Sequence, residues 1–217
     1  MRNGMISKAT IGRLPLYLQF IRTVKTEMVS SATVARHLGL GEVQVRKDLA
    51  SICPAGMPKI GYPTGRLRED LEAVLGMKQT IPAVVVGAGK LGRALMAYDG
   101  FREYGLEIAA AFDTRAVGSS PERKPVLPME QMSGWCREHD VHIGILTVPA
   151  GAAQEAADQM VNSGITAILS FVSVPIRVPD SVTVKHENIA LSLACLKIAA
   201  GMSNETTEED SHGSEDL

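Results

Sequence analysis

The sequence predicts an α/β protein of two unlike domains, a small helical domain followed by one built on a parallel sheet. Three observations carry this prediction: helical periodicity dominates residues 1–78, strands and helices alternate after Pro82, and the charge divides the chain at the same place. Residues 1–78 hold 12 Lys+Arg and 6 Asp+Glu, a balance of +6, whereas residues 79–202 hold 10 and 12, a balance of −2. The basic first domain suggests a polyanionic partner, although solvated surface also accounts for such an excess.

The first expected element is a helix over residues 10–25, in which apolar side chains from Ile11 to Val24 roughly share one face. Thr10 is a candidate cap for this helix. Pro15 lies inside the segment, so the helix must either begin there or bend.

Residues 30–52 have the pattern of a helix-turn-helix. Ser31 is expected to cap a short helix that runs to Leu38, and Gly39 can supply the turn because glycine adopts positive φ. A second helix over residues 42–52 buries three apolar side chains and leaves four polar ones outward: Gln44, Arg46, Lys47 and Ser51. Gln and Arg read base edges and Lys neutralises phosphates, so this face is predicted to bind DNA. A solvated face in an ordinary helical bundle is the alternative.

The Pro- and Gly-rich stretch of residues 54–70 predicts a basic hairpin, with Ile60-Gly61-Tyr62 as an edge strand and Pro63-Thr64-Gly65 as a turn. Lys59, Arg66 and Arg68 supply its charge. A helix-turn-helix followed by a basic hairpin is the order of a winged helix, whose wing lies along the DNA backbone or in the minor groove. A helix over residues 67–75, ended by Gly76, and a linker of residues 77–82 complete the first domain.

The second domain is predicted to be Rossmann-like, because strand and helix patterns alternate along residues 79–185. The expected strands cover residues 83–86, 107–112, 141–148, 167–171 and 182–185. The expected helices cover residues 90–98, 129–139 and 150–163.

A glycine-rich turn, Gly87-Ala88-Gly89-Lys90-Leu91-Gly92, connects the first of these strands to the first helix. The first glycine permits a tight turn, the second lets a pyrophosphate approach the backbone, and the third permits close contact between helix and strand. The free N–H groups of the helix point at the phosphates. Asp113, at the end of the second strand, is placed to bind the hydroxyls of an adenine ribose. The motif therefore predicts a dinucleotide, with NAD(H) favoured by the charge of Asp113, although Arg115 is placed to accept a ribose phosphate.

The sequence does not predict an enzyme or a metal site. Tyr98 is followed by Arg102 rather than by the lysine of a Tyr-x-x-x-Lys motif, and no further domain follows to hold a substrate. The three cysteines match no metal spacing, and the pair His139 and His142 lacks further ligands nearby. Arg13 and Arg22 interrupt the first apolar stretch, and no apolar run reaches the ~18–20 residues of a membrane span, so a cytoplasmic location is expected.

Over about residues 5–202 the chain resembles the Rex family of redox-sensing transcriptional repressors. The resemblance lies in several long motifs in the family's order: ISKATIGRLPLYLQFI, VQVRKDL, KIGYPTGRL, VVVGAGKLGRAL with YDGF, AAFD and GILTVPAGAAQEAADQMVNSGI. It implies a homodimer whose winged helices bind a palindromic operator and whose Rossmann domains bind NADH or NAD⁺. NADH would close the dimer, move the wings apart and release DNA.

The resemblance also assigns site residues. Those expected to contact DNA are Arg13, Gln44, Arg46, Lys47, Lys59, Gly61 and Tyr62. Those expected to bind the dinucleotide are Gly87, Ala88, Gly89, Lys90, Leu91, Gly92, Tyr98, Asp113, Thr147, Val148, Pro149 and Phe171. Tyr98 matches a tyrosine that the family places near the nicotinamide and the subunit contact.

The chain is expected to end in a C-terminal helix within residues 186–202, swapped between subunits, and in a disordered acidic tail of residues 203–217. The alternative is a last helix packed on its own sheet. The sequence departs from the family here, with Ala190 in place of the acidic residue that would pair with Arg13, and Ser170 in place of the usual asparagine. Two other functions stay open: a nicotinamide-dependent oxidoreductase, and a regulator that responds to CoA or another nucleotide.

Overall fold

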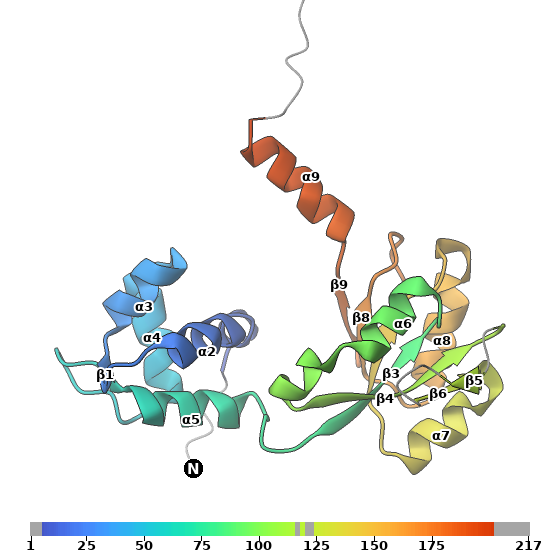
Figure 1. The fold of residues 1–217 in the computed structure, drawn as a ribbon, viewed down its shortest axis with the longest axis horizontal. Coiled ribbons are helices and arrows are strands. Elements are labelled where there is room, and N and C mark those ends of the chain that lie inside the picture. The colour runs from blue at the N-terminus through green and yellow to red at the C-terminus, as the bar shows by residue number, and fades with distance from the viewer. Residues whose placement is uncertain (1–5, 116–117, 120–123, 202–217) are drawn as a thin grey trace, which may run out of the picture.

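The computed structural model describes residues 6–115, 118–119 and 124–201. It contains a helical N-terminal domain, a sheet domain, and a last helix that projects away from both (Figure 1). The expected tail of residues 203–217 lies outside the described residues.

The N-terminal domain packs its helices around one apolar core, in which Leu14, Leu18, Leu49, Leu67 and Leu71 are 0% exposed. Its elements are α1 (Lys8–Ile11), α2 (Leu14–Thr23), β1 (Met28–Val29), α3 (Ser31–Leu38), α4 (Glu42–Ile52), β2 (Tyr62–Pro63) and α5 (Thr64–Val74). The predicted helix-turn-helix is confirmed, with α4 at its predicted bounds and Gly39 left-handed at a φ of 65°.

Both predicted N-caps are wrong by small shifts. The helix begins at Leu14, with Pro15 in its first turn, and Thr10 lies in the separate helix α1. Because Thr10 lies within α1 and Arg13 precedes α2, the Thr10 hydroxyl caps neither helix, and it donates instead to a carboxylate oxygen of Asp48 at 3.0 Å. Ser30, not Ser31, caps α3 by accepting the N–H of Thr33 at 3.1 Å.

The hairpin also differs from the prediction. β2 pairs antiparallel with β1, so that Val29 faces Tyr62, and the predicted turn at Pro63-Thr64-Gly65 is wrong because Thr64 and Gly65 open α5. Pro63, at a φ of −59°, already has the backbone geometry that precedes a helix. Arg66 and Arg68 therefore lie on α5 rather than on the wing, which is the hairpin of residues 54–63.

The second domain has a seven-stranded sheet in the order β5-β6-β4-β3-β7-β8-β9, in which all neighbours except β5 and β6 run parallel. The strands are β3 (Ile81–Val86), β4 (Leu106–Asp113), β5 (Gly118–Ser119), β6 (Pro125–Pro128), β7 (Ile143–Leu146), β8 (Ala167–Ser170) and β9 (Thr183–His186). The helices between them are α6 (Lys90–Ala97), η1 (Asp99–Tyr104), η2 (Met129–Gln131), α7 (Met132–Glu138), η3 (Ala150–Ala152) and α8 (Ala153–Asn162). The six parallel strands follow the order of a doubly wound dinucleotide-binding sheet.

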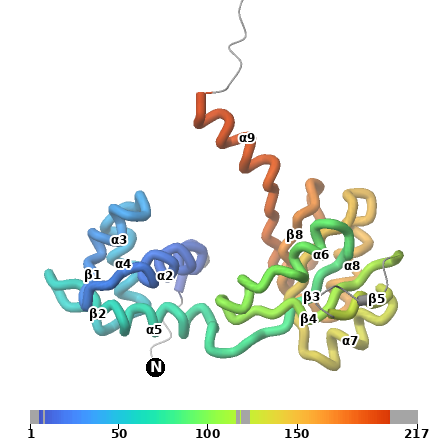
Figure 2. Tube along the Cα trace, in the orientation of Figure 1, coloured from blue at the N-terminus to red at the C-terminus, as the bar shows by residue number. Residues whose placement is uncertain are grey.

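The strand order reverses beside β3, and this reversal positions the functional site. β3 lies between β4 and β7, so Gly87 and Thr147, which follow β3 and β7, meet at the carboxyl edge of the sheet. The Thr147 N–H donates to the carbonyl oxygen of Val86 at 2.9 Å. In open α/β sheets ligands bind at this kind of switch point. The chain enters β3 from α5 through a short connector (Figure 2).

The last helix, α9 (Ile189–Ala199), is exposed along its whole length and projects from the end of β9 (Figure 1). Five large apolar side chains are each between 59% and 66% exposed: Ile189, Leu191, Leu193, Leu196 and Ile198. The alternative of a last helix packed on its own sheet is therefore wrong. Within the described residues, no helix has the length and apolar character to span a membrane.

Candidate functional site

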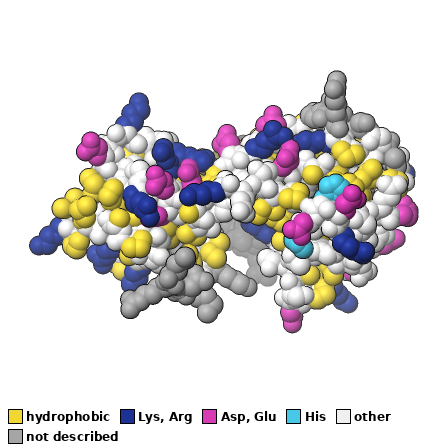
Figure 3. Space-filling model, turned by 90° about the horizontal axis from the view of Figure 1, so that it is seen from below, with side chains coloured by type: hydrophobic (Ala, Val, Ile, Leu, Met, Phe, Trp, Pro, Cys, Tyr) yellow, Lys and Arg dark blue, Asp and Glu magenta, His cyan; other side chains and the backbone are white. Residues whose placement is uncertain are grey.

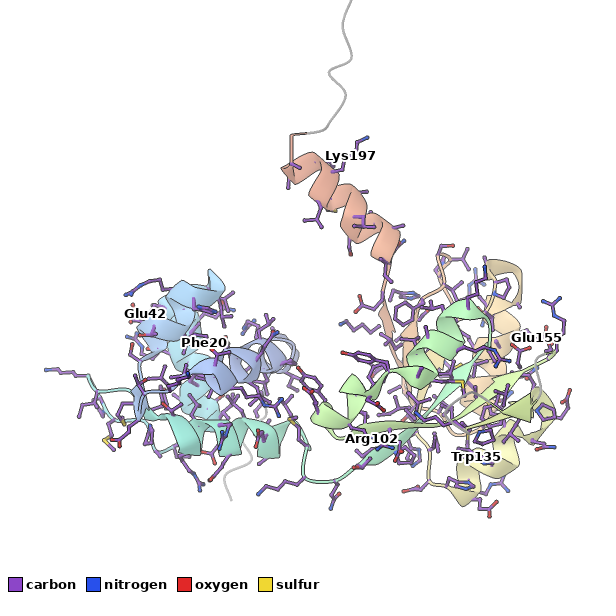
Figure 4. All side chains as sticks on the ribbon, in the orientation of Figure 1. Phe20, Glu42, Arg102, Trp135, Glu155 and Lys197 are labelled. Atoms are coloured by element: carbon purple, nitrogen blue, oxygen red, sulfur yellow. The ribbon has the colours of Figure 1, made fainter. Side chains whose placement is uncertain are left out.

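The carboxyl edge of the sheet carries a cleft of about 460 Å³. Its lining comes from the segments that follow β3 and β7, the end of β4, η2, η3 and α8: Gly87, Gly89, Phe112, Asp113, Thr114, Arg115, Met129, Thr147, Val148, Pro149, Ala152, Glu155, Ala156 and Gln159. Glu155 is labelled on α8 in Figure 4. The glycine turn and the loop after β7 thus both contribute to the lining of the cleft.

Each glycine of the turn meets a different steric requirement. Gly87 has a φ of 99°, which favours glycine, and its N–H donates to the carbonyl oxygen of Phe112 at 2.8 Å. A Cβ on Gly89, at the start of α6, would meet no atom within 4 Å, so the backbone is open to a ligand there. A Cβ on Gly92 would lie 1.9 Å from the carbonyl oxygen of Gly87. The geometry agrees with the three roles predicted for the motif.

Asp113 is fixed in the cleft by backbone donors. Its Oδ2 accepts the N–H of Ala88 at 2.7 Å, and its Oδ1 accepts the N–H of Arg115 at 2.7 Å. The hydroxyl of Thr147, in the loop after β7, donates to the carbonyl oxygen of Gly87 at 2.7 Å. The carboxylate is thereby held at the end of β4, where a ribose on a phosphate-binding turn would lie.

The structure brings together six of the twelve residues predicted to bind the dinucleotide: Gly87, Gly89, Asp113, Thr147, Val148 and Pro149. Ala88 and Gly92 are buried behind the turn, and Lys90 and Leu91 lie exposed on the first turn of α6. Tyr98 and Phe171 do not line this cleft. Tyr98 is 59% exposed and packs edge-on against Phe101, with the ring centroids 5.1 Å apart.

Sequence reasoning missed the wall of the cleft that α8 supplies. Glu155 and Gln159 are one helical turn apart and both face the cleft, beside Ala152 and Ala156. The available signal was two polar side chains at i and i+4 in a helix that begins just after Pro149. These residues add a carboxylate and an amide to the lining of the cleft.

The candidate nucleic-acid interface is the outer face of α4, with the hairpin beside it. Gln44, Arg46 and Lys47 are all exposed. A hollow of about 700 Å³ separates α4 from the hairpin and is lined by Ser30, Ser31, Arg46, Lys59, Gly61 and Tyr62, among others. Four of the seven residues predicted to contact DNA therefore border one hollow; Arg13, Gln44 and Lys47 do not line it. Tyr62 is 7% exposed, so its ring packs inward.

The hairpin tip depends on unusual backbone angles. Lys59 is left-handed at a φ of 65°, and the N–H of Met57 donates to the carbonyl oxygen of Gly61 at 2.7 Å. Gly61 has a φ of 116°, and a Cβ there would lie 2.4 Å from the backbone oxygen of Val29. The wing therefore lies so close to β1 that any side chain larger than that of glycine at position 61 would clash with β1.

We expect Gly61→Ala to lower the affinity for duplex DNA about tenfold or more, because the wing must move away from β1. Fluorescence anisotropy with a labelled duplex measures this loss. Gly65→Ala is the matched control, since a Cβ on Gly65 meets no atom within 4 Å and alanine favours a helix. Equal affinity in the two variants would contradict the role of Gly61.

A buried carboxylate lies under α4. Asp48 is 6% exposed and accepts from the Thr10 hydroxyl at 3.0 Å, the Tyr17 hydroxyl at 2.7 Å and the Arg13 Nε at 2.8 Å. Arg13 Nη2 lies 3.0 Å from its other oxygen, which makes the ion pair bidentate. Asp48 occupies an inward position of α4 between Val45 and Ile52, which sequence analysis did not use.

The pKa values of this cluster follow from its geometry. Burial acts to raise the pKa of Asp48, but the hydrogen bonds from Arg13, Tyr17 and Thr10 outweigh burial and hold it below its ordinary value. Burial and the hydrogen bond to Asp48 raise the pKa of Tyr17 to about 12. The hydrogen bond to Asp48 raises the pKa of Arg13. The cluster therefore holds Asp48 ionised and Tyr17 protonated at neutral pH.

In the described part of the sheet domain, no charged side chain is buried as Asp48 is. Among the described residues, no group of three or more His, Cys, Asp or Glu is placed to hold a metal ion. His142 pairs with Asp140 at 3.0 Å on the surface, and His139 stacks on Trp135 with the ring centroids 3.9 Å apart. Acidic and basic side chains are interspersed on the face shown in Figure 3, as on an ordinary solvated surface.

Two family models match the chain. Residues 78–174 match the model described as "CoA binding domain", and residues 5–50 match "Putative DNA-binding protein N-terminus". The first match covers the glycine turn and the cleft, and the second ends within α4.

Similar proteins extend over nearly the whole chain. The redox-sensing transcriptional repressor Rex of Treponema denticola is 41% identical over 87% of this chain and 92% of its own length. That of Carboxydothermus hydrogenoformans is 38% identical over 90% of this chain and 97% of its own length. A crystal structure of RSP with β-NAD⁺ and operator DNA covers 91% of this chain and 94% of its own, at a TM-score of 0.83 and 28% identity. RSP with β-NADH gives a TM-score of 0.81 at 28% identity, with 91% and 95% covered.

Proposed function

The chain belongs to the Rex family of redox-sensing transcriptional repressors, and from this premise we propose that it binds a palindromic operator as a cytoplasmic homodimer and leaves it when NADH binds. Members of this family are repressors rather than enzymes. The observation that carries the proposal is Asp113, whose carboxylate is held beside an open glycine turn in the same chain as an exposed recognition helix. The sensed ligand is NADH or NAD⁺.

The proposed dinucleotide pose uses the turn, Asp113 and the loop after β7. The pyrophosphate lies at Gly89 and the start of α6, whose first N–H groups are free to donate. The ribose hydroxyls reach Asp113, and Thr147, Val148 and Pro149 flank the nicotinamide end. Ala88, Lys90, Leu91 and Gly92 support the turn, and Tyr98 and Phe171 contribute only if the domains or subunits rearrange around the cofactor.

The proposed DNA contact uses α4 and the wing. Gln44 and Arg46 read base edges from the major groove, and Lys47 and Lys59 neutralise phosphates. Gly61 lets the wing lie close to β1, and the buried ring of Tyr62 packs beneath the wing. Arg13 belongs to this set through its position beside α4.

The proposed homodimer uses α9, because five apolar side chains on this helix are more than half exposed in a single chain. Exchange of α9 between two subunits would bury them against the partner's domains. Sedimentation or light scattering of the purified protein tests this directly, and a single-subunit species at micromolar concentration would overturn it.

Redox sensing requires that NADH prefer one arrangement of the dimer over the other. A hundredfold preference supplies about 2.7 kcal/mol. NAD⁺ must differ less, since its charged ring suits an apolar pocket poorly. The test is operator binding measured against NADH and NAD⁺ in separate titrations; equal effects of the two would contradict the proposal.

We expect Asp113→Ala to weaken NADH binding about tenfold to a hundredfold, because the ribose loses a charged hydrogen-bond acceptor. Isothermal titration with NADH measures the change, and DNA binding without cofactor serves as the control. An unchanged NADH affinity, with CoA bound equally well, would favour the CoA-responsive alternative suggested by the family model for residues 78–174.

Arg46→Ala is expected to weaken operator binding about tenfold or more and to leave NADH binding unchanged, since Arg46 lies on the exposed face of α4. The operator is obtained by selection from a randomised duplex pool with the wild-type protein. Full operator affinity in this variant would show that α4 is not the recognition helix.

A further inference from the structure

We infer that Arg13 holds the amide oxygen of Gln44, so that Gln44 presents only N–H donors and reads guanine rather than adenine. The inference rests on the proposed function, because it concerns the helix proposed to enter the major groove. It assigns Arg13 a positioning role and makes Gln44 a specificity-determining residue.

The side chains of Arg13 and Gln44 are in direct contact. Arg13 Nη1 and Nη2 lie 2.9 Å and 3.2 Å from the end of the Gln44 amide. A guanidinium only donates hydrogen bonds, so the group that faces it must be the amide oxygen. The NH₂ group of Gln44 then lies away from Arg13, and no hydrogen bond of the described residues uses it.

The buried carboxylate of Asp48 holds the Arg13 side chain in place. Its Nε and Nη2 bind the two carboxylate oxygens of Asp48 at 2.8 Å and 3.0 Å, and Asp48 is itself held by Thr10 and Tyr17. The Arg13 side chain is 19% exposed and that of Asp48 is 7% exposed. Because the buried Asp48 carboxylate holds the planar Arg13 guanidinium, turning this group away from Gln44 would break its ion pair with Asp48. The exposed Gln44 amide is therefore anchored from inside the domain.

Adenine and guanine differ in the hydrogen-bond donors and acceptors on their major-groove edges. A free glutamine pairs with adenine by donating to N7 and accepting from N6. In Gln44 the acceptor is engaged by Arg13, and the outward group offers two N–H donors. Guanine offers two acceptors, N7 and O6, on its major-groove edge, so an anchored Gln44 matches guanine.

The experiment compares variants on the duplex selected by the wild-type protein from a randomised pool. Gln44→Ala identifies the base pair that Gln44 reads, as the position where discrimination is lost. We expect guanine there, with a wild-type preference over adenine of at least about fivefold. Arg13→Lys keeps the positive charge beside Asp48 but lacks the fork that reaches Gln44, and should reduce this preference to within about twofold.

The double variant Arg13→Lys/Gln44→Ala should lose no more discrimination than either single variant, because both remove the same contact. Arg22→Lys is the matched control: it makes the same change on α2, where Arg22 pairs with Glu72, and should keep the full preference. Circular dichroism checks that each variant is folded. If Arg13→Lys does not fold, Gln44→Glu replaces it, since this variant keeps an acceptor for Arg13, lacks the NH₂ donors and should no longer prefer guanine.

Adenine at the position read by Gln44, full discrimination in the folded Arg13→Lys variant, or additive losses in the double variant would each overturn the inference. Failure of the wild-type protein to select any duplex would instead overturn the proposed function, and this inference with it. The two failures are thus distinguishable.

Discussion

Gly92→Ala is expected to weaken NADH binding at least a hundredfold, about 2.7 kcal/mol, and to lower the melting temperature by several degrees. The added Cβ would lie 1.9 Å from the carbonyl oxygen of Gly87 and 3.0 Å from the hydroxyl oxygen of Thr147. The first of these is a backbone atom in the glycine turn, and it cannot move without displacing that turn. Helix α6 must therefore separate from the strand, and its free N–H groups no longer converge on the pyrophosphate.

Fluorescence titration with NADH measures the affinity, and thermal unfolding measures the stability. Gly134→Ala in α7 is the control, because a Cβ there meets no atom within 4 Å and alanine stabilises a helix interior by roughly 0.5–1 kcal/mol over glycine. NADH affinity within threefold of wild type in Gly92→Ala would show that the turn does not need this glycine.

Asp48→Ala is expected to destabilise the N-terminal domain by about 3–5 kcal/mol, because it leaves the largely buried Arg13 and the fully buried Tyr17 without their shared acceptor. The chain has one tryptophan, Trp135, which lies in the sheet domain. Its fluorescence therefore follows unfolding of that domain, while circular dichroism follows both. In urea, the variant should show an early dichroism transition and an unchanged Trp135 transition.

Glu69→Ala is the control, since Glu69 and its partner Arg66 are both more than half exposed and surface pairs contribute about 0–1 kcal/mol. Acid titration adds an independent test. The pKa of Asp48 is lowered in the folded state, so its stabilisation is present at neutral pH and disappears as the pH falls through that lowered value. Wild-type protein should lose N-terminal stability over this acidic range more steeply than Asp48→Ala. An equal loss of stability with falling pH in the two proteins would contradict this role of Asp48.

The parts of the fold that sequence predicted are those set by local rules. Gly39 and Gly76 end their helices at positive φ, and α4 has its predicted bounds because a glycine turn precedes it. β6 was missed, because a four-residue strand with proline at each end lacks the usual strand pattern. Thr10 was misassigned as a cap because its partner, Asp48, is 38 residues away along the chain.

The candidate site divides in the same way. The glycine turn and Asp113 were predictable because their spacing reflects one strand-turn-helix unit. Glu155 and Gln159 were not, since the docking of α8 across the sheet decides which side of it faces the cleft. The link between Arg13 and Gln44 likewise depends on the packing of α2 against α4.

Because of helix α9, assembly of this protein should depend on its concentration. In the proposed homodimer a second molecule covers its exposed apolar side chains, and the encounter of two molecules obeys mass action. At low copy number α9 would stay exposed to solvent and the protein would stay monomeric. Repression would therefore increase more than linearly with the protein concentration. A cell that doubles expression would thus gain more than twice the assembled form in the dilute range.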